Sequence, residues 1–281
     1  TLSVLQDVLD QVGWVRDQLI KFPLEDKKAF AILNDEKYAG IFQFEGYALQ
    51  GVTRQMKVHN FEDVAAITAL ARPGPLNSGG TSQFIKRHIG AAPAEYMHPM
   101  TEPITKVTHG VVVYQEQVMT IGREIGKLSW EDVSFLRKAM SKSYGKEYFD
   151  TFWEKFKVGA AENGIPEDVA QTIWDNINTM GSWAFNRSHA ISYGLVSYWC
   201  CVLKSRFPLE YAAACLRNVK DDDQAVKLLR EVVSEGLTYK PFDKFKSKAN
   251  WSVQDNELIG GLIGIKGIGP KMAEDIENRR N

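Results

Sequence analysis

Hydrophobic positions recur at helical spacing along most of the chain. Near the start, Leu5, Val8, Val12, Val15 and Leu19 fall on one face of a helix expected over residues 1–22. The same period appears in residues 25–34, 60–71, 114–126, 129–140, 166–180, 192–207 and 223–236. The pattern therefore predicts a mainly α-helical protein with a few short strands.

Several of these helices carry start signals. Asn60, Ser129 and Pro166 stand at expected first turns, and acidic residues follow each of them. Such residues favour helix starts, and nearby carboxylates are stabilised by the helix dipole. Asp221 and Asp223 also lie at a helix start, so capping explains them better than a metal-binding carboxylate pair.

The composition changes after Gly236. Lysines, aromatic residues and short alternating apolar segments follow, and they favour a small strand pair over another helix. We therefore expect a first domain over residues 1–236 and a smaller region over residues 237–281.

Charge and cysteine content limit the class of protein. The formal net charge is −1, so bulk attraction to nucleic acid or to an anionic membrane is not expected. Cys200, Cys201 and Cys215 fit no zinc-binding spacing, which predicts reduced thiols, a cytoplasmic location and no metal site. No apolar run reaches membrane-spanning length. Because the chain begins at Thr1, we expect it to be a piece of a longer protein.

The segment "ALARPGPLNSGG" places a lone cation on a stiff corner. Arg72 and Gly74 each precede a proline, which pushes the preceding residue toward extended conformations. The guanidinium is then held in one direction. From this segment alone, a rigid loop with an exposed arginine is the simpler interpretation.

A basic segment follows at residues 134–146, with no acidic residue. It contains Arg137, Lys138, Lys142 and Lys146. Lys138 and Lys142 are one helical step apart, where like charges cost roughly a few tenths of a kcal/mol. A bound anion compensates such repulsion, but a solvated basic face explains the segment equally well.

Polar residues lead into the helix expected over residues 192–207. Asn186, Arg187 and His189 come first, and Tyr193 and Ser197 follow His189 at steps of four. A helix N-terminus favours anions, so His189 is a candidate phosphate contact or proton donor. By itself, such a histidine is more often a hydrogen-bonded core residue.

Evidence for catalysis is weak. Glu116 follows a short β-branched run, where a cap or a buried network explains it better than a catalytic role. The chain lacks the sequence signatures of phosphate-binding loops, serine hydrolases and zinc proteases. We therefore expect no catalytic residue here.

The segment "IKGIGPKMAEDI" has the helix-hairpin-helix pattern. Gly267 and Gly269 allow close backbone approach, and Pro270 suits a first helical turn. Free amides at that helix start, with Ile268 before them and Lys271 beside them, favour a phosphate oxygen. This hairpin is expected to grip DNA backbone without reading its sequence.

Seven motifs, taken in order, resemble one protein family. They are "GIFQFEG", "ALARPGPL", "FIKRHIG", "HGVVVYQEQVM", "LRKAM", "FNRSHAISYGLVSYWCCVLKSRFPLEY" and "GLIGIKGIGP". They look like the alpha subunit of bacterial replicative DNA polymerase III, a C-family polymerase. The resemblance covers nearly all of the chain, as a fingers domain and the start of a duplex-binding helix-hairpin-helix region.

The resemblance implies a parent nucleotidyltransferase that uses two Mg²⁺ ions held by palm carboxylates outside this chain. The fragment is then inactive alone and binds no cofactor. Its implied partners are primer-template DNA, deoxynucleoside triphosphates, the remaining polymerase domains, and replisome subunits such as the sliding clamp through regions not present here. No membrane partner is implied.

The resemblance also implies two sets of site residues. The nucleotide-binding set is Arg72, Arg137, Lys138, Lys142, Asn186, Arg187, His189 and Tyr193, and the DNA-binding set is Gly267, Ile268, Gly269 and Lys271.

Where the family commonly has "LRRAMGKK", this chain has Lys138 and Ser143 in place of an arginine and a lysine. Lysine keeps the charge but loses the forked geometry of arginine. The family's "FNKSHAAAYALVSY" appears here as "FNRSHAISYGLVSY", so a divergent branch of bacterial or phage origin is expected. A stand-alone DNA-binding hairpin module and a helical scaffold remain alternative functions.

Overall fold

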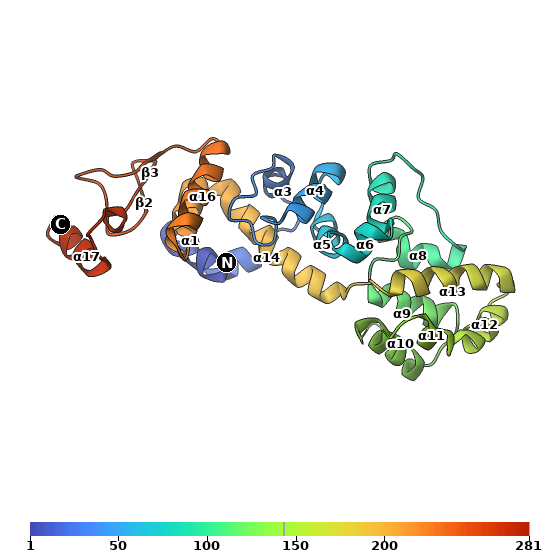
Figure 1. The fold of residues 1–281 in the computed structure, drawn as a ribbon. Coiled ribbons are helices and arrows are strands. Elements are labelled where there is room, and N and C mark those ends of the chain that lie inside the picture. Colours follow the sequence, from blue (N-terminus) through green and yellow to red (C-terminus); the bar gives the residue numbers. More distant parts are fainter. Residues whose placement is uncertain (143, 281) are drawn as a thin grey trace. The chain divides into compact units, whose positions relative to one another are not determined.

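The protein is mainly helical in its computed structural model, which describes residues 1–142 and 144–280 (Figure 1). The α-helices are α1 (Leu2–Val12), α2 (Arg16–Ile20), α3 (Lys27–Asn34), α4 (Tyr47–Met56), α5 (Phe61–Leu70), α6 (Pro73–Asn77), α7 (Gly80–His88), α8 (Glu102–Thr105), α9 (Gln115–Glu124), α10 (Trp130–Lys142), α11 (Lys146–Asp150), α12 (Trp153–Glu162), α13 (Glu167–Gly181), α14 (Arg187–Arg206), α15 (Pro208–Arg217), α16 (Asp222–Ser234) and α17 (Pro270–Asn278). The 3₁₀ helices are η1 (Pro99–Thr101), η2 (Lys106–Thr108) and η3 (Leu262–Gly264), and the strands are β1 (Tyr239–Lys240), β2 (Ser252–Gln254) and β3 (Glu257–Ile259). The predicted fold class is confirmed.

Two compact units divide the chain. One contains Thr1–Gly46 and Val196–Asn281, and the other is Tyr47–Leu195. Helix α14 begins in the second unit and continues into the first. This division by packing does not test the domain boundary that the change in composition predicts near Leu237, which stays a prediction.

The core of the unit Tyr47–Leu195 forms where α9, α10, α12 and α13 pack together. Trp174 of α13 is fully buried, and its ring centroid lies 4.9 Å from that of Phe156 of α12. Burying an aromatic side chain stabilises the fold by roughly 1.5–3 kcal/mol. This core supports the helices that carry the candidate site.

A close backbone approach joins α12 to the end of α9. A Cβ atom added at Gly159 would lie 2.0 Å from the carbonyl oxygen of Gly126. The two segments pack at this distance only because neither residue has a side chain.

The expected start signals are used in three places. The Asn60 side chain accepts a hydrogen bond from the Asp63 amide, while Asp63 accepts one from the Asn60 amide. Ser129 caps α10 by accepting from the amide of Asp132 at 3.0 Å. Asp221 caps α16, so the capping interpretation of the Asp221-x-Asp223 spacing is confirmed.

The prediction of a single helix over residues 1–22 is wrong. Helix α1 ends at Val12 because Gly13 adopts a left-handed conformation with φ of 70°. The chain restarts as α2, and Val15 is 62% exposed. Periodicity alone missed this break because apolar residues continue past the glycine.

The expected strand pair is present and is extended by a third strand. Strand β3 pairs antiparallel with β2 and parallel with β1, which gives the order β1-β3-β2. The β2–β3 turn holds Asp255 and Asn256 at positive φ, which short polar residues tolerate. Within residues 1–236, the expected short strands reduce to an isolated parallel bridge between Tyr114 and Phe185 among the described residues.

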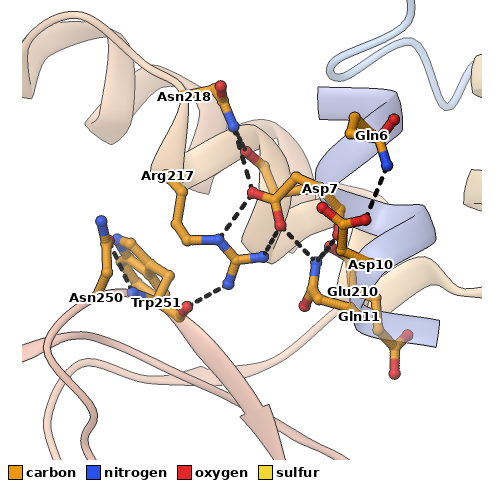
Figure 2. A network of polar contacts seen from close by, with 10 residues as sticks. Gln6, Asp7, Asp10, Gln11, Glu210, Arg217, Asn218, Asn250 and Trp251 are labelled. Carbon is orange, nitrogen blue, oxygen red and sulfur yellow. Dashed lines mark hydrogen bonds and ion pairs between the residues drawn. The ribbon is translucent and has the colours of Figure 1, made fainter. Parts of the chain in front are cut away.

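Arg217 of α15 ties this sheet to the helices of the same unit (Figure 2). Its guanidinium donates to both carboxylate oxygens of Asp7 in α1. It also donates to the carbonyl of Trp251, just before β2. A planar, bidentate pair of this kind fixes orientation as well as distance.

Among the described helices, none combines the length and the apolar character needed to cross a bilayer. Cys200, Cys201 and Cys215 are free and buried, as expected for reduced thiols.

Candidate nucleic-acid interface

Arg72 is held in one direction, as its position before Pro73 predicts. Its backbone is extended, with φ −130° and ψ 156°, and it forms the N-cap of α6. Its Nε donates to the carbonyl of Ala69 at 3.1 Å, and its Nη2 donates to the carbonyl of Trp183 at 2.6 Å. Its Cζ lies 4.3 Å from the ring centroid of Phe185. The guanidinium is thus directed largely at protein groups, and burial lowers its pKa.

The expectation for Gly74 is wrong. It lies inside α6, although Pro75 follows it. Glycine has no Cβ to clash with the proline ring, so the usual restriction before proline is relaxed. A Cβ at Gly74 would lie 2.7 Å from the Cβ of Trp183, so this glycine also allows α6 to pack closely.

Asn186 caps α14. Its Oδ1 accepts from the amide of His189 at 2.8 Å, and its Nδ2 donates to Glu116 at 3.0 Å. The other Glu116 oxygen accepts from the amide of Arg187 at 2.9 Å. The structural interpretation of Glu116 is therefore confirmed, because its carboxylate holds the start of α14. The sequence pattern does not reveal that Glu116 and Asn186 accept hydrogen bonds from two backbone amides at this helix N-terminus.

Arg187 is engaged by protein groups. Its Nη2 donates to both carboxylate oxygens of Glu62, at 3.1 and 3.2 Å. Its Cζ lies 5.8 Å from the centroid of the Tyr114 ring, and burial raises the pKa of the Tyr114 phenol. The Arg187 Nε is buried with no hydrogen-bond partner among the described residues. The predicted nucleotide contact through Arg187 stays a prediction.

A cavity of about 560 Å³ lies beside these groups. Its lining includes Tyr114, Glu116 and Arg187 together with apolar residues such as Ile104 and Met100. The Glu116 carboxylate at this cavity already accepts hydrogen bonds from Asn186 and from the Arg187 amide at the start of α14.

His189 and Tyr193 stack on the first turns of α14. Their ring centroids are 4.1 Å apart, and the His189 ring also contacts Phe185 edge-on at 5.4 Å. His189 is exposed, so the core-histidine interpretation is wrong. The expected polar stripe ends after Tyr193, because Ser197 is buried and donates to the Phe42 carbonyl at 2.8 Å.

Phe185 is a site residue that sequence reasoning missed. Its ring lies under the Arg72 guanidinium and against His189. An isolated aromatic before a polar segment gives no periodic signal, so only the fold identifies it. Arg72, Phe185, His189 and Tyr193 thus form a continuous cation-aromatic row.

Helix α10 presents the exposed cations Arg137, Lys138 and Lys142. None of the three forms a hydrogen bond or an ion pair with another described residue. The helix reaches Lys142, so Lys138 and Lys142 do lie one helical step apart on it. Ser143, which departs from the family pattern, lies outside the described residues.

Two hydrogen bonds connect the end of α10 to the start of α14. The Gln115 side chain donates to the Ser141 hydroxyl at 3.4 Å. The Gln115 amide donates to the Phe185 carbonyl at 2.9 Å. Residues that lie far apart in the sequence, on α6, α10 and α14, are therefore joined by one contact network.

The hairpin segment forms a separate candidate site. Gly267 has φ of 92°, Gly269 is the N-cap of α17, and Lys271 is exposed. The amides of Gly269, Lys271 and Met272 donate to no described residue. A Cβ at Gly267 or Gly269 would meet nothing within 4 Å, so the turn faces open space.

The element before this turn is shorter than the helix-hairpin-helix pattern implies. It is the 3₁₀ helix η3, and Ile268 donates back to the Ile265 carbonyl at 3.0 Å. The second helix, α17, begins at Pro270, as the sequence predicts. The duplex-binding role of Gly267, Ile268, Gly269 and Lys271 stays a prediction.

Comparison with known proteins gives the family. Residues 1–164 match the family described as the bacterial DNA polymerase III alpha subunit finger domain. The chain is similar to DNA polymerase III subunit alpha of Aquifex aeolicus, with 34% identity over 280 residues that cover 99% of this chain and 24% of that protein. It is 33% identical over 288 residues to that of Mycobacterium tuberculosis strain H37Rv, covering 100% of this chain and 24% of that protein.

A third relative is the DNA polymerase III subunit alpha of Chlamydia trachomatis, with 38% identity over 259 residues that cover 92% of this chain and 21% of that protein. The chain thus spans between about a fifth and a quarter of the length of these relatives. Because the family match covers more than half of its residues, the chain belongs to the bacterial DNA polymerase III alpha subunit finger domain family.

Proposed function

We propose that this chain is the fingers part of a replicative DNA polymerase and binds the triphosphate of the incoming deoxynucleotide together with the template. The observation that supports this proposal is the set of three exposed cations, Arg137, Lys138 and Lys142, without described partners. They lie on a helix that Gln115 links to the start of α14.

The chemistry of these groups suits a triphosphate. Phosphoryl transfer depends on fixed cations placed beside the transferred phosphates. Two backbone amides at the α14 N-terminus are not free to bind a phosphate, because they already donate to Glu116 and Asn186. We therefore assign the phosphates to the α10 side chains and the base to the ring pair of His189, which is exposed, and Tyr193, which is half-buried, since base-aromatic stacking contributes about 1–3 kcal/mol.

The described residues do not fit a two-magnesium catalytic site. Mg²⁺ prefers oxygen ligands, whereas the one potential metal cluster found among the described residues, His59, Asp63 and His88, has a single carboxylate. We propose that the metal-binding carboxylates belong to another part of the polymerase. The chain alone is then expected to show no primer extension with Mg²⁺, and extension is expected when it is joined to a palm that supplies those carboxylates.

The proposal is tested by nucleotide binding to the 281-residue chain. Lys138→Glu with Lys142→Glu is expected to weaken binding of a fluorescent deoxynucleoside triphosphate at least tenfold. The matched control, Lys27→Glu with Lys28→Glu, changes the net charge equally on α3, where both residues are also exposed. Equal loss in both double variants, or in neither, contradicts the proposal.

A second candidate function, non-specific duplex binding, is favoured by the unpaired amides at the start of α17. Positive φ at Gly267 tolerates a side chain poorly. Gly267→Val with Lys271→Glu is expected to weaken duplex binding strongly and to lower the salt slope of the remaining binding by roughly one per lost phosphate contact. Retained binding in this variant contradicts the hairpin assignment.

The remaining assignments follow from the family. We propose primer-template DNA and other polymerase and replisome components as partners, and the bacterial cytoplasm as the location. A purely scaffolding role predicts no salt-sensitive DNA binding at low ionic strength.

A further inference from the structure

Two imidazoles lie near one carboxylate where the start of α5 meets the end of α7, and a third imidazole contacts one of them. His59 precedes the N-cap of α5, and Asp63 lies in its first turn. His88 is the last residue of α7, and His109 follows η2. All four belong to the unit Tyr47–Leu195.

The distances in this cluster do not match direct hydrogen bonds to the carboxylate. His59 Nδ1 lies 3.8 Å from Asp63 Oδ2, and His88 Nδ1 lies 3.7 Å from Asp63 Oδ1. Hydrogen bonds fall at about 2.7–3.2 Å. Two ligands bound tetrahedrally at about 2.0–2.1 Å lie roughly 3.3 Å apart. His59, Asp63 and His88 each offer one ligand atom, and these atoms lie within 4.8 Å of one another. Small side-chain rotations therefore allow all three to bind one ion.

The electrostatic environment favours a cation. The side chains of Asp63 and His88 are each only 6% exposed. Asp63 accepts from the amides of His59 and Asn60, and no lysine or arginine forms an ion pair with it among the described residues. A buried carboxylate that forms no ion pair with a lysine or arginine is stabilised by a positive ion.

Solvent access also suits an ion. The His59 side chain is 65% exposed, which gives a route from solvent. His109 Nε2 lies 3.2 Å from His88 Nδ1, so a third imidazole lies beside the cluster.

We propose that His59, Asp63 and His88 form a binding site for a transition-metal dication of the Zn²⁺ type. Two imidazoles and one carboxylate suit zinc, whereas Mg²⁺ and Ca²⁺ select oxygen ligands. The ion joins the start of α5 to the end of α7. Its role is structural and independent of nucleotide binding.

The affinity is expected to be moderate. Binding through His88 Nδ1 places the ring proton on Nε2, which is buried with no hydrogen-bond partner among the described residues. A missing second-shell acceptor typically lowers metal affinity by about 10–100-fold. The cysteines do not compete, because Cys200, Cys201 and Cys215 are buried and burial raises the pKa of their thiols.

The test is a Co²⁺ titration of the metal-free 281-residue chain, followed by displacement with Zn²⁺. One equivalent of Co²⁺ is expected to give visible d–d absorption that Zn²⁺ removes. His59→Ala is expected to weaken binding at least tenfold without unfolding the chain, because the side chain is mostly exposed. His189→Ala removes an exposed histidine outside the cluster and is expected to leave metal affinity unchanged.

A second variant separates the metal site from the helix cap. Asp63→Asn keeps an acceptor for the His59 and Asn60 amides but removes the ligand charge. It is expected to fold and to lose both Co²⁺ binding and the rise in melting temperature that Zn²⁺ gives to the unmodified chain. The absence of a one-to-one complex overturns the proposal, as does binding of equal strength in His59→Ala and the unmodified chain.

Discussion

Replacing Arg72 with alanine tests whether this residue mainly holds the framework of the site. The change removes two hydrogen bonds from the guanidinium to the carbonyls of Ala69 and Trp183 and its contact with Phe185. Hydrogen bonds from a charged donor contribute about 1.5–3 kcal/mol each, and a cation–π contact about 0.5–2 kcal/mol. Because Arg72 is only half-buried, the lower ends apply, and loss of the two hydrogen bonds alone is expected to cost about 3 kcal/mol.

Hydrogen exchange measured by mass spectrometry reports this loss locally. The peptides covering α6 and residues 181–186 are expected to exchange roughly a hundredfold faster in Arg72→Ala, since 1.4 kcal/mol corresponds to a factor of ten. Arg137→Ala serves as the control, because an exposed arginine without described partners changes stability by no more than about 0.5 kcal/mol. Exchange within twofold of the unmodified chain, combined with weaker nucleotide binding, refutes the framework role and assigns Arg72 to the ligand.

Other predictions concern the same unit. Gly159→Ala is expected to destabilise this unit by about 1–3 kcal/mol in urea unfolding, because the new Cβ meets the Gly126 carbonyl. The control is Gly51→Ala on α4, where the added Cβ meets open space. It is expected to stabilise the unit by up to about 1 kcal/mol. The pKa of Asp132 is raised by burial but lowered more by hydrogen bonds from Lys155 and Ser129, so it lies below its ordinary value. Its contribution to stability is thus present above the unfolded pKa of about 3.9 and is lost as the pH falls through the lower folded value. Urea midpoints of Asp132→Asn and the unmodified chain are expected to differ at pH 6 and to converge in acid; a constant difference contradicts this assignment.

Local signals in the sequence predict most helices but not their breaks. The caps at Asn60 and Ser129 are used as expected, because a cap depends on residues within one turn. The continuous helix over residues 1–22 fails at Gly13, where a left-handed residue ends α1 without interrupting the apolar pattern. Helices α12 and α15 were not predicted; in α15 the consecutive burial of Tyr211–Leu216 hides the helical period.

The metal cluster shows the same limit. His59 and Asp63 are close in the sequence, but His88 and His109 come from other elements. No fixed ligand spacing links them, so the sequence predicts no metal site. Only the packing of α5 against its neighbours brings these side chains together.

The candidate nucleotide site depends on contacts that span long sequence separations. The bond between Asn186 and Glu116 joins residues 70 positions apart. In the sequence the start of α14 has the character of an open anion site, with Asn186, Arg187 and His189 around it. In the fold the Glu116 carboxylate already accepts from the Arg187 amide, and a second anion at that position would meet like charge. Under the proposed function, phosphate recognition is therefore expected from side chains without a described protein partner, so we propose Arg137, Lys138 and Lys142 of α10 ahead of the α14 N-terminus.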